Sequence, residues 1–270
     1  MPDPAPRPSR PPAAPVPPGV PVLRRRDGLV QVGSSPRSAR LHRSDELPRD
    51  SGTGGPGGPE VSDEVRAWSA YDREGAGPRD RSRRRTRSAV AVAGPAATAG
   101  AVVAVLADAG VGRLLSDRPL PGTTTGSQHP ADLLVLVHDH VADPVVADGV
   151  LADGVPHLSV VLRDTDAVVG PLVLPGRSAC LRCLDRWRTD ADPAWPEQRS
   201  ALLRAAPRPP DAATTRVVAG LAGLQVLSHL DGLTASTVGA SLEVLLPEGR
   251  VRQRWWRPHP ACGCLDLPVP

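Results

Sequence analysis

The chain has 270 residues, of which 23% are charged, and a formal net charge of +3. Its apolar runs are shorter than the roughly 20 residues that cross a membrane, and its N-terminus lacks the apolar core of a signal peptide, so we expect a cytoplasmic protein without membrane contact. A net charge this small does not by itself argue for a nucleic-acid partner, and we do not expect one.

The first 87 residues are predicted to hold little regular structure. We expect residues 1–19 to be a disordered Pro/Arg-rich tail, because they contain too few large apolar residues to bury a core. Within residues 20–48, Asp27-Gly28 separates two runs of alternating apolar residues, which predicts a β-hairpin. Residues 49–87 are interpreted as a linker. Its Arg79–Arg87 stretch is interpreted as a solvated lead-in to the next strand rather than a phosphate-binding patch, because no aromatic residues interleave for base stacking.

Residues 88–270 are predicted to form one α/β domain. Short, unbroken apolar runs are typical of buried parallel strands. The predicted strands are Ala89–Ala93, Gly112–Asp117, Asp132–Val137 and Val155–Leu162. Helices are expected between them at Ala96–Ala109 and Pro144–Asp153, each ended by a glycine. This alternation with short turns predicts a Rossmann-like parallel sheet with helices on both faces.

The C-terminal third is expected to be irregular, then helical, then a hairpin. Asp185–Pro210 is polar and broken by prolines, whereas Asp211 predicts the N-cap of a helix over Ala212–Leu230. The expected apolar face of that helix consists of Val217, Val218, Leu221, Leu224, Val226 and Leu227. Residues 237–256 have the pattern of a hairpin, and we interpret Trp255 and Trp256 as its half-buried packing rather than an exposed contact patch.

The four cysteines occur as two tight pairs, Cys180-x-x-Cys183 and Cys262-x-Cys264. Thiolates at such spacings bind one tetrahedral ion, and Gly263 permits the sharp turn that the second pair needs. We therefore favour a structural Zn²⁺ that staples the C-terminal hairpin to the segment after the sheet. Two disulfides or a redox pair remain alternatives, although a chain without an export signal favours free thiols. His259 is a spare candidate ligand.

Three motifs carry a family resemblance. They are Val92-Ala93-Gly94 through Gly110-Val111-Gly112-Arg113, Val169–Val173 leading into the first cysteine pair, and His259-Pro260-Ala261-Cys262-Gly263-Cys264. Together they make residues 88–264 resemble the ThiF-type superfamily, the ubiquitin-activating-enzyme-like adenylyltransferases, and in particular its actinobacterial branch related to azoline-forming cyclodehydratases. The resemblance implies a structural zinc at the paired cysteines. It also implies a homodimer, because members of the family often pair.

The same resemblance implies a site for ATP and Mg²⁺ at Gly94, Asp117 and Asp139. His138 and His140, which flank Asp139, are interpreted as solvated. The phosphate loop departs from the family pattern, because Pro95 is inserted and alanines stand at positions 96 and 99, where methyl groups and a missing N–H obstruct the approach of a phosphate. The stretch Arg118–Ala131 between the two carboxylates has no Lys, and Arg118 is its only Arg. We therefore expect adenylation to be weak or lost, since it needs cations around the leaving pyrophosphate.

The N-terminal piece Val22–Arg43 resembles the opening hairpin of the small winged-helix domain that binds leader peptides in related maturation proteins, so residues 20–48 are interpreted as a possible remnant of it. The leading hypothesis is a degenerate ThiF-like protein that binds a peptide or protein substrate or supports a partner enzyme. The alternatives are an active ATP-dependent adenylyltransferase acting on a peptide, and a nucleic-acid-associated protein using Arg79–Arg87.

Overall fold

The computed structural model describes residues 21–35, 39–43, 77–116, 131–207 and 209–266. The chain divides into two compact units, Met1–Arg79 and Asp80–Pro270. The predictions for the tail at residues 1–19, most of the linker and the loop that contains Asp117 and Arg118 lie outside the described residues.

The first unit contains a three-stranded antiparallel sheet in the order β1-β2-β3. Its strands are β1 (Val22–Arg24), β2 (Leu29–Val32) and β3 (Arg40–Arg43). The predicted hairpin is confirmed: Gly28 adopts φ 80°, and the Leu29 N–H donates to the Asp27 carboxylate over 3.2 Å. The third strand was not predicted, and kinship with a winged-helix domain stays a prediction.

The second unit is built on a seven-stranded sheet in the order β10-β9-β8-β7-β6-β4-β5. The four predicted strands correspond to β4 (Ala89–Ala93), β5 (Arg113–Leu115), β6 (Leu133–Asp139) and β7 (His157–Leu162), and they pair in parallel. An unpredicted strand, β8 (Asp166–Val173), pairs antiparallel to β7 and to β9 (Ala240–Leu245). It therefore joins the predicted hairpin of β9 and β10 (Arg250–Trp255) to the parallel part of the sheet.

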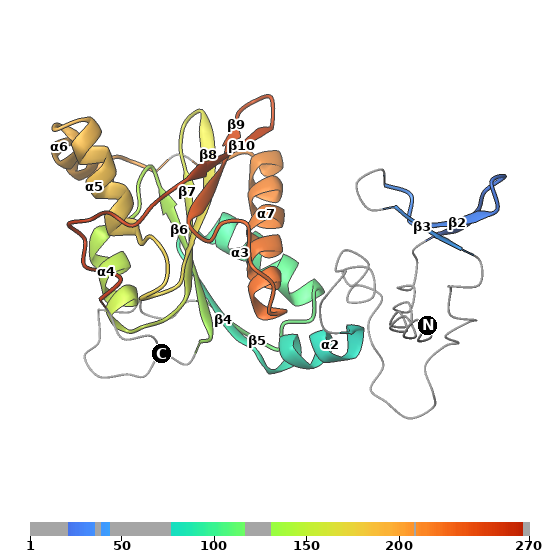
Figure 1. The fold of residues 1–270 in the computed structure, drawn as a ribbon. Coiled ribbons are helices and arrows are strands. Elements are labelled where there is room, and N and C mark those ends of the chain that lie inside the picture. Colours follow the sequence, from blue (N-terminus) through green and yellow to red (C-terminus); the bar gives the residue numbers. More distant parts are fainter. Residues whose placement is uncertain (1–20, 36–38, 44–76, 117–130, 208, 267–270) are drawn as a thin grey trace, which may run out of the picture. The chain divides into compact units, whose positions relative to one another are not determined.

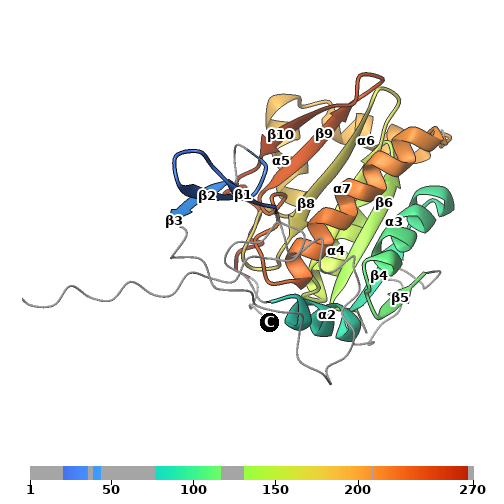
Figure 2. The ribbon, with the colours of Figure 1, turned by 90° about the vertical axis from the view of Figure 1, so that its right-hand side faces the viewer.

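Helices cover both faces of this sheet (Figures 1 and 2). On one face, α3 (Ala96–Asp108) packs beside α7 (Ala212–Leu230); on the other lie α4 (Pro144–Ala152) and α5 (Leu181–Ala191), followed by α6 (Trp195–Arg204). The predicted Asp211 cap is confirmed, because its carboxylate accepts the N–H groups of Ala213 and Thr214. The predicted α/β, Rossmann-like fold is therefore confirmed.

Three sequence-based expectations are corrected in this unit. Arg79–Arg87 is helical rather than a solvated linker, as part of α2 (Pro78–Arg87), with Arg81 and Arg85 fully buried. This burial also removes a continuous exposed basic patch. Most of Asp185–Pro210 is helical, in α5 and α6, because Leu181 and Leu184 lie one turn apart and bury one side of α5. Val217 and Leu224 of α7 are exposed rather than part of its apolar face, whereas Val218 and Ala222 are fully buried.

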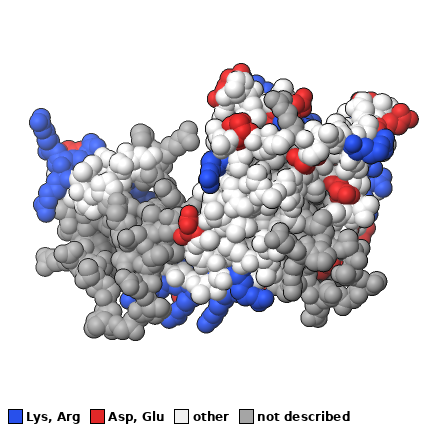
Figure 3. Space-filling model, turned by 180° about the vertical axis from the view of Figure 1, so that it is seen from behind, with Lys and Arg blue, Asp and Glu red and all other residues white. Residues whose placement is uncertain are grey.

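The surface of the described residues is unevenly charged. Seen from behind, it shows a broad area with few charged side chains between charged margins (Figure 3). None of the described helices combines the length and the hydrophobicity needed to cross a lipid bilayer.

Candidate metal centre and adjoining pocket

The four cysteines meet at one point, as their spacing predicts. Their sulfur atoms all lie within 4.8 Å of one another, and all four residues are buried. Cys180 Sγ is 3.8 Å from Cys183 Sγ and 3.6 Å from Cys262 Sγ, and Cys183 Sγ is 3.4 Å from Cys264 Sγ. These separations are too long for disulfide bonds, which have an S–S length of about 2 Å.

Local structure explains the convergence. Cys180 occupies the N-cap of α5 and Cys183 lies in its first turn, so both sulfurs project from the same end of the helix. On the other side, the Cys262 N–H donates to the His259 carbonyl over 2.9 Å, and Gly263 takes φ 69°, which closes a turn that presents both thiols. The cluster packs against apolar side chains of α4, β8 and the C-terminal segment, including Leu151, Val173 and Trp256.

Two groups beside the cluster donate to its sulfurs. The Arg182 Nε–H lies 3.4 Å from Cys262 Sγ, and the His259 backbone N–H lies 3.3 Å from Cys183 Sγ. The His259 ring instead contacts the Asp190 carboxylate at 2.9 Å and accepts the Ala261 N–H, so its nitrogens are directed away from the sulfurs. His259 is therefore a neighbour of the cluster and not a fifth ligand.

The cluster has the chemistry of a zinc site. Four sulfurs around Zn²⁺ at a Zn–S distance of about 2.3 Å would lie about 3.8 Å apart, close to the separations found here. The thiol of Cys180 and the His259 N–H lower the pKa of Cys183 to about 4, whereas burial raises the pKa of Cys264 to about 11. A hydrogen bond to Cys183 also raises the pKa of Cys180. Only a bound cation allows four buried sulfurs to be thiolates together.

The predicted nucleotide contacts lie at the carboxyl ends of neighbouring strands. Gly94 follows β4, and Asp139 ends β6. Gly94 has a structural reason of its own: it adopts φ 128°, and a Cβ there would lie 2.1 Å from the Val137 carbonyl oxygen. Ala96 starts α3 behind Pro95, and no side chain caps that helix among the described residues. Asp139 is half-buried, and its carboxylate has no hydrogen-bond partner in the described part of the chain.

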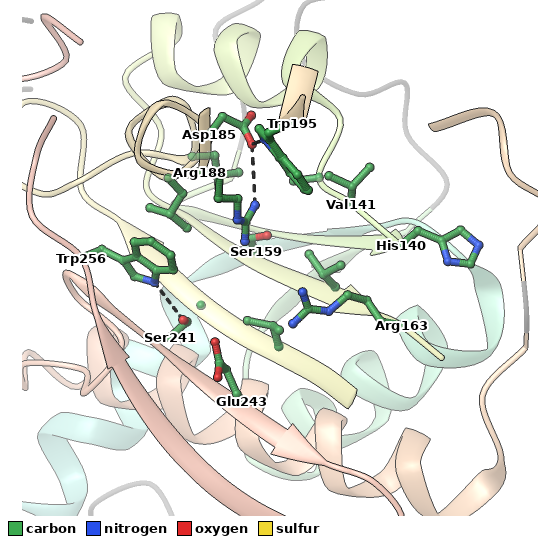
Figure 4. A pocket seen from close by; sticks show the side chains of 16 residues that line it. His140, Val141, Ser159, Arg163, Asp185, Arg188, Trp195, Ser241, Glu243 and Trp256 are labelled. Atoms are coloured by element: carbon green, nitrogen blue, oxygen red, sulfur yellow. Dashed lines mark hydrogen bonds and ion pairs between the residues drawn. The ribbon is translucent and has the colours of Figure 1, made fainter. Parts of the chain in front are cut away.

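A pocket lies beside this edge, between α5–α6 and the strands β7, β8 and β9 (Figure 4). Figure 4 shows Asp185, Arg188 and Trp195 on its helical side and Ser241 and Glu243 on its strand side. Its rim includes His140, directly after β6. Sequence reasoning missed this pocket because it placed no helix at residues 185–210, although Leu181, Leu184 and Trp187 at spacings of three were a usable helical signal.

The pocket combines a cation, two indole rings and an unsatisfied hydroxyl. The Arg188 guanidinium lies 5.0 Å from the Trp195 ring and 5.8 Å from the Trp256 ring, and its Nη1 is 3.6 Å from the Asp185 carboxylate. Burial lowers the pKa of Arg188. The Ser159 hydroxyl is buried and has no hydrogen-bond partner among the described residues. Such a site suits a polar or anionic group of a ligand.

The prediction that His138 is solvated is wrong. His138 was interpreted as solvated, but its Nε2 is buried without a partner among the described residues. His157 on β7 is fully buried, and its Nδ1 lies 2.9 Å from the Val155 carbonyl oxygen. The two tryptophans were predicted to be half-buried in the hairpin rather than exposed. Trp255 is instead 70% exposed, whereas Trp256 is buried.

The fold is shared with solved structures, although no family model matches the chain and no curated protein matches its sequence. A structure described as a heterocyclase in complex with substrate and cofactor aligns with a TM-score of 0.68 at 16% identity, over 93% of this chain and 39% of that one. E. coli MccB with the SeMet form of MccA aligns with a TM-score of 0.62 at 13% identity, over 93% and 98%. Another structure of E. coli MccB gives 0.57 at 16% identity, over 76% and 73%. This chain therefore shares its fold with E. coli MccB and with part of a heterocyclase.

Proposed function

We propose that this chain is a ThiF-like partner protein in peptide modification, which binds a peptide or partner enzyme and adenylates weakly or not at all. The observation that carries the proposal is the start of α3. Pro95 and Ala96 stand there in place of the open, N–H-rich backbone that holds a phosphate, and no side chain among the described residues caps the helix. The similarity to MccB, solved with MccA, and to a substrate-bound heterocyclase supports a peptide as the ligand.

The pocket under α5–α6 is the proposed place for a polar end of that peptide. It adjoins the carboxyl end of β6, because His140 and Val141 help to line it, and Arg188 and Ser159 offer donors to a carboxylate or amide. The four-cysteine cluster, for which we propose structural zinc, fixes the start of α5, and with it Asp185 and Arg188. Leader-peptide binding by residues 20–48, a homodimer and a cytoplasmic location remain predictions.

An active adenylyltransferase is the second candidate, because Asp139 at the end of β6 is free to face a nucleotide and its Mg²⁺. ATP–pyrophosphate exchange with purified protein and candidate peptides separates the two functions. We expect no exchange above background, together with peptide binding that is at least tenfold weaker in Arg188→Gln than in the control Arg186→Gln, an exposed position on α5. Rapid exchange that disappears in Asp139→Asn would establish the active enzyme instead.

A further inference from the structure

The edge strand β10 has an unusual combination of exposure and sequence. It lies at the end of the seven-stranded sheet and pairs only with β9 among the described strands (Figure 2). All six of its residues, Arg250–Trp255, are exposed. The strand is therefore exposed along its length, and the Gln253 side chain donates to the Ser236 carbonyl over 2.9 Å.

The free edge carries unpaired backbone groups at defined positions. Just beyond β10, the Trp256 N–H donates to the Gly239 carbonyl over 2.8 Å, toward the β9 side. Because neighbouring residues of a strand direct their backbone groups to opposite sides, Val251, Gln253 and Trp255 point theirs outward. Three alternate residues of β10 therefore offer N–H and C=O groups with which a further strand can pair.

The side chains of β10 separate by charge. Arg250, Arg252 and Arg254 lie on one face, and Val251, Gln253 and Trp255 on the other. Arg254 lies 3.7 Å from Glu243 and stacks on Trp256 at 4.4 Å, whereas Arg250 and Arg252 have no ion-pair partner among the described residues. Val251 is 45% exposed and Trp255 is 70% exposed. Charged residues alone would protect an edge from pairing, but an exposed indole beside free backbone groups favours contact.

We propose that the β10 edge binds an extended acidic segment of a partner polypeptide as an eighth strand. Main-chain hydrogen bonds form along Val251, Gln253 and Trp255, carboxylates at alternate positions of the partner pair with Arg250 and Arg252, and the intervening apolar side chains rest on Val251 and Trp255. A second copy fits less well, because antiparallel pairing of two β10 strands places arginines opposite arginines. This site goes beyond the proposed function, since it is separate from the pocket and needs no nucleotide.

The test uses the full chain and two fluorescein-labelled peptides, one alternating glutamate with valine and one alternating lysine with valine. We expect the acidic peptide alone to change fluorescence anisotropy on titration. Gln253→Pro removes the central outward N–H, whereas Gln253→Ala removes the same side chain and keeps the N–H. Binding should weaken at least tenfold in Gln253→Pro and stay within about twofold of the parent in Gln253→Ala. Arg252→Glu should weaken it at least tenfold, and the surface control Arg186→Glu should leave it unchanged.

Several outcomes overturn the proposal. Equal binding in Gln253→Pro and Gln253→Ala would show attraction by charge without strand addition. Unchanged binding in Arg252→Glu, or no binding of the acidic peptide, would exclude the acidic partner. A dimer of the parent that Gln253→Pro dissociates in analytical ultracentrifugation would make a second copy the occupant. Arg252→Glu changes only an exposed side chain. It therefore tests binding of the acidic partner even where the proline variant fails to fold.

Discussion

The guanidinium group of Arg85 in α2 holds the carboxylate of Asp231, the residue that follows α7. Nε lies 3.0 Å from Oδ1 and Nη2 lies 2.6 Å from Oδ2, and both side chains are at most 1% exposed. Arg85 also donates to the Ala109 carbonyl at the end of α3 over 3.1 Å, and Arg84 donates to the Asp231 carbonyl over 3.2 Å. Two arginines of α2 therefore satisfy carbonyls at the C-terminal ends of α3 and α7, where positive charge is stabilising.

Removing one partner of this buried pair should be costly. Asp231→Ala is expected to lower the free energy of unfolding by about 3–5 kcal/mol, because Arg85 keeps a buried charge without its carboxylate. Asp148→Ala, which breaks the exposed pair with Arg182 at 3.9 Å, is the control and should cost at most about 1 kcal/mol. Urea unfolding followed by circular dichroism measures both. Equal decreases in the free energy of unfolding of the two variants would show that the buried pair stabilises the fold no more than the exposed pair does.

Gly94 and Gly100 form a matched pair for the turn before α3. Gly94→Ala should lower the free energy of unfolding by about 2–4 kcal/mol, because the new methyl group meets the Val137 carbonyl and φ is 128°. Gly100→Ala lies inside α3, where a Cβ meets nothing within 4 Å, and should raise stability by about 0.5–1 kcal/mol. Both are measured without nucleotide. A harmless Gly94→Ala would mean that the turn has no structural need for glycine.

The four-cysteine cluster predicts metal-dependent stability. Purified protein should contain about one zinc per chain, and Cys180→Ser should lose it, with the melting temperature falling about 2–4 °C for each kcal/mol of stability lost. His259→Gln should retain the metal, since its ring contacts Asp190 and Ala261 rather than the sulfurs. Elemental analysis and thermal melting give both readouts. Metal-free protein with four rapidly titrating thiols would contradict the site.

His157 and His138 predict that the protein weakens in mild acid. Burial lowers the pKa of each from 6.5 to about 4. Below pH 6.5 the unfolded chain therefore takes up protons that the folded chain does not, and stability present above that pH is lost progressively toward pH 4. The loss amounts to at most about 1.4 kcal/mol per pH unit and per histidine.

His157→Asn isolates the contribution of that histidine. Asparagine keeps a donor for the Val155 carbonyl and does not titrate, so the variant should lose less stability than the parent between pH 7 and pH 5. Urea unfolding at a series of pH values measures the slope. An unchanged slope would show that His157 does not bear the acid sensitivity.

Local sequence patterns predicted the secondary-structure elements that are specified by hydrophobic periodicity, by a helix cap or by a turn. The apolar run Ala89–Ala93, the Asp211 cap and the Asp27-Gly28 turn each specify their own backbone without reference to a distant partner. The two cysteine pairs were equally informative. Their close spacing within each pair is explained if all four sulfur atoms meet in one cluster, as they do in the structure. The sequence therefore predicted the cysteine cluster better than the pocket, whose residues come from several segments that carry no shared motif.

From its sequence alone, this protein could be assigned a Rossmann-like sheet and a four-sulfur cluster. Only the tertiary structure decided that Arg85 is buried, that Trp255 is exposed while its neighbour Trp256 is not, and that β10 forms an open edge. The physical reason is that burial depends on which surface a side chain meets after folding. A stretch of arginines or a pair of tryptophans has the same local pattern whether that surface is Asp231, a neighbouring helix or water.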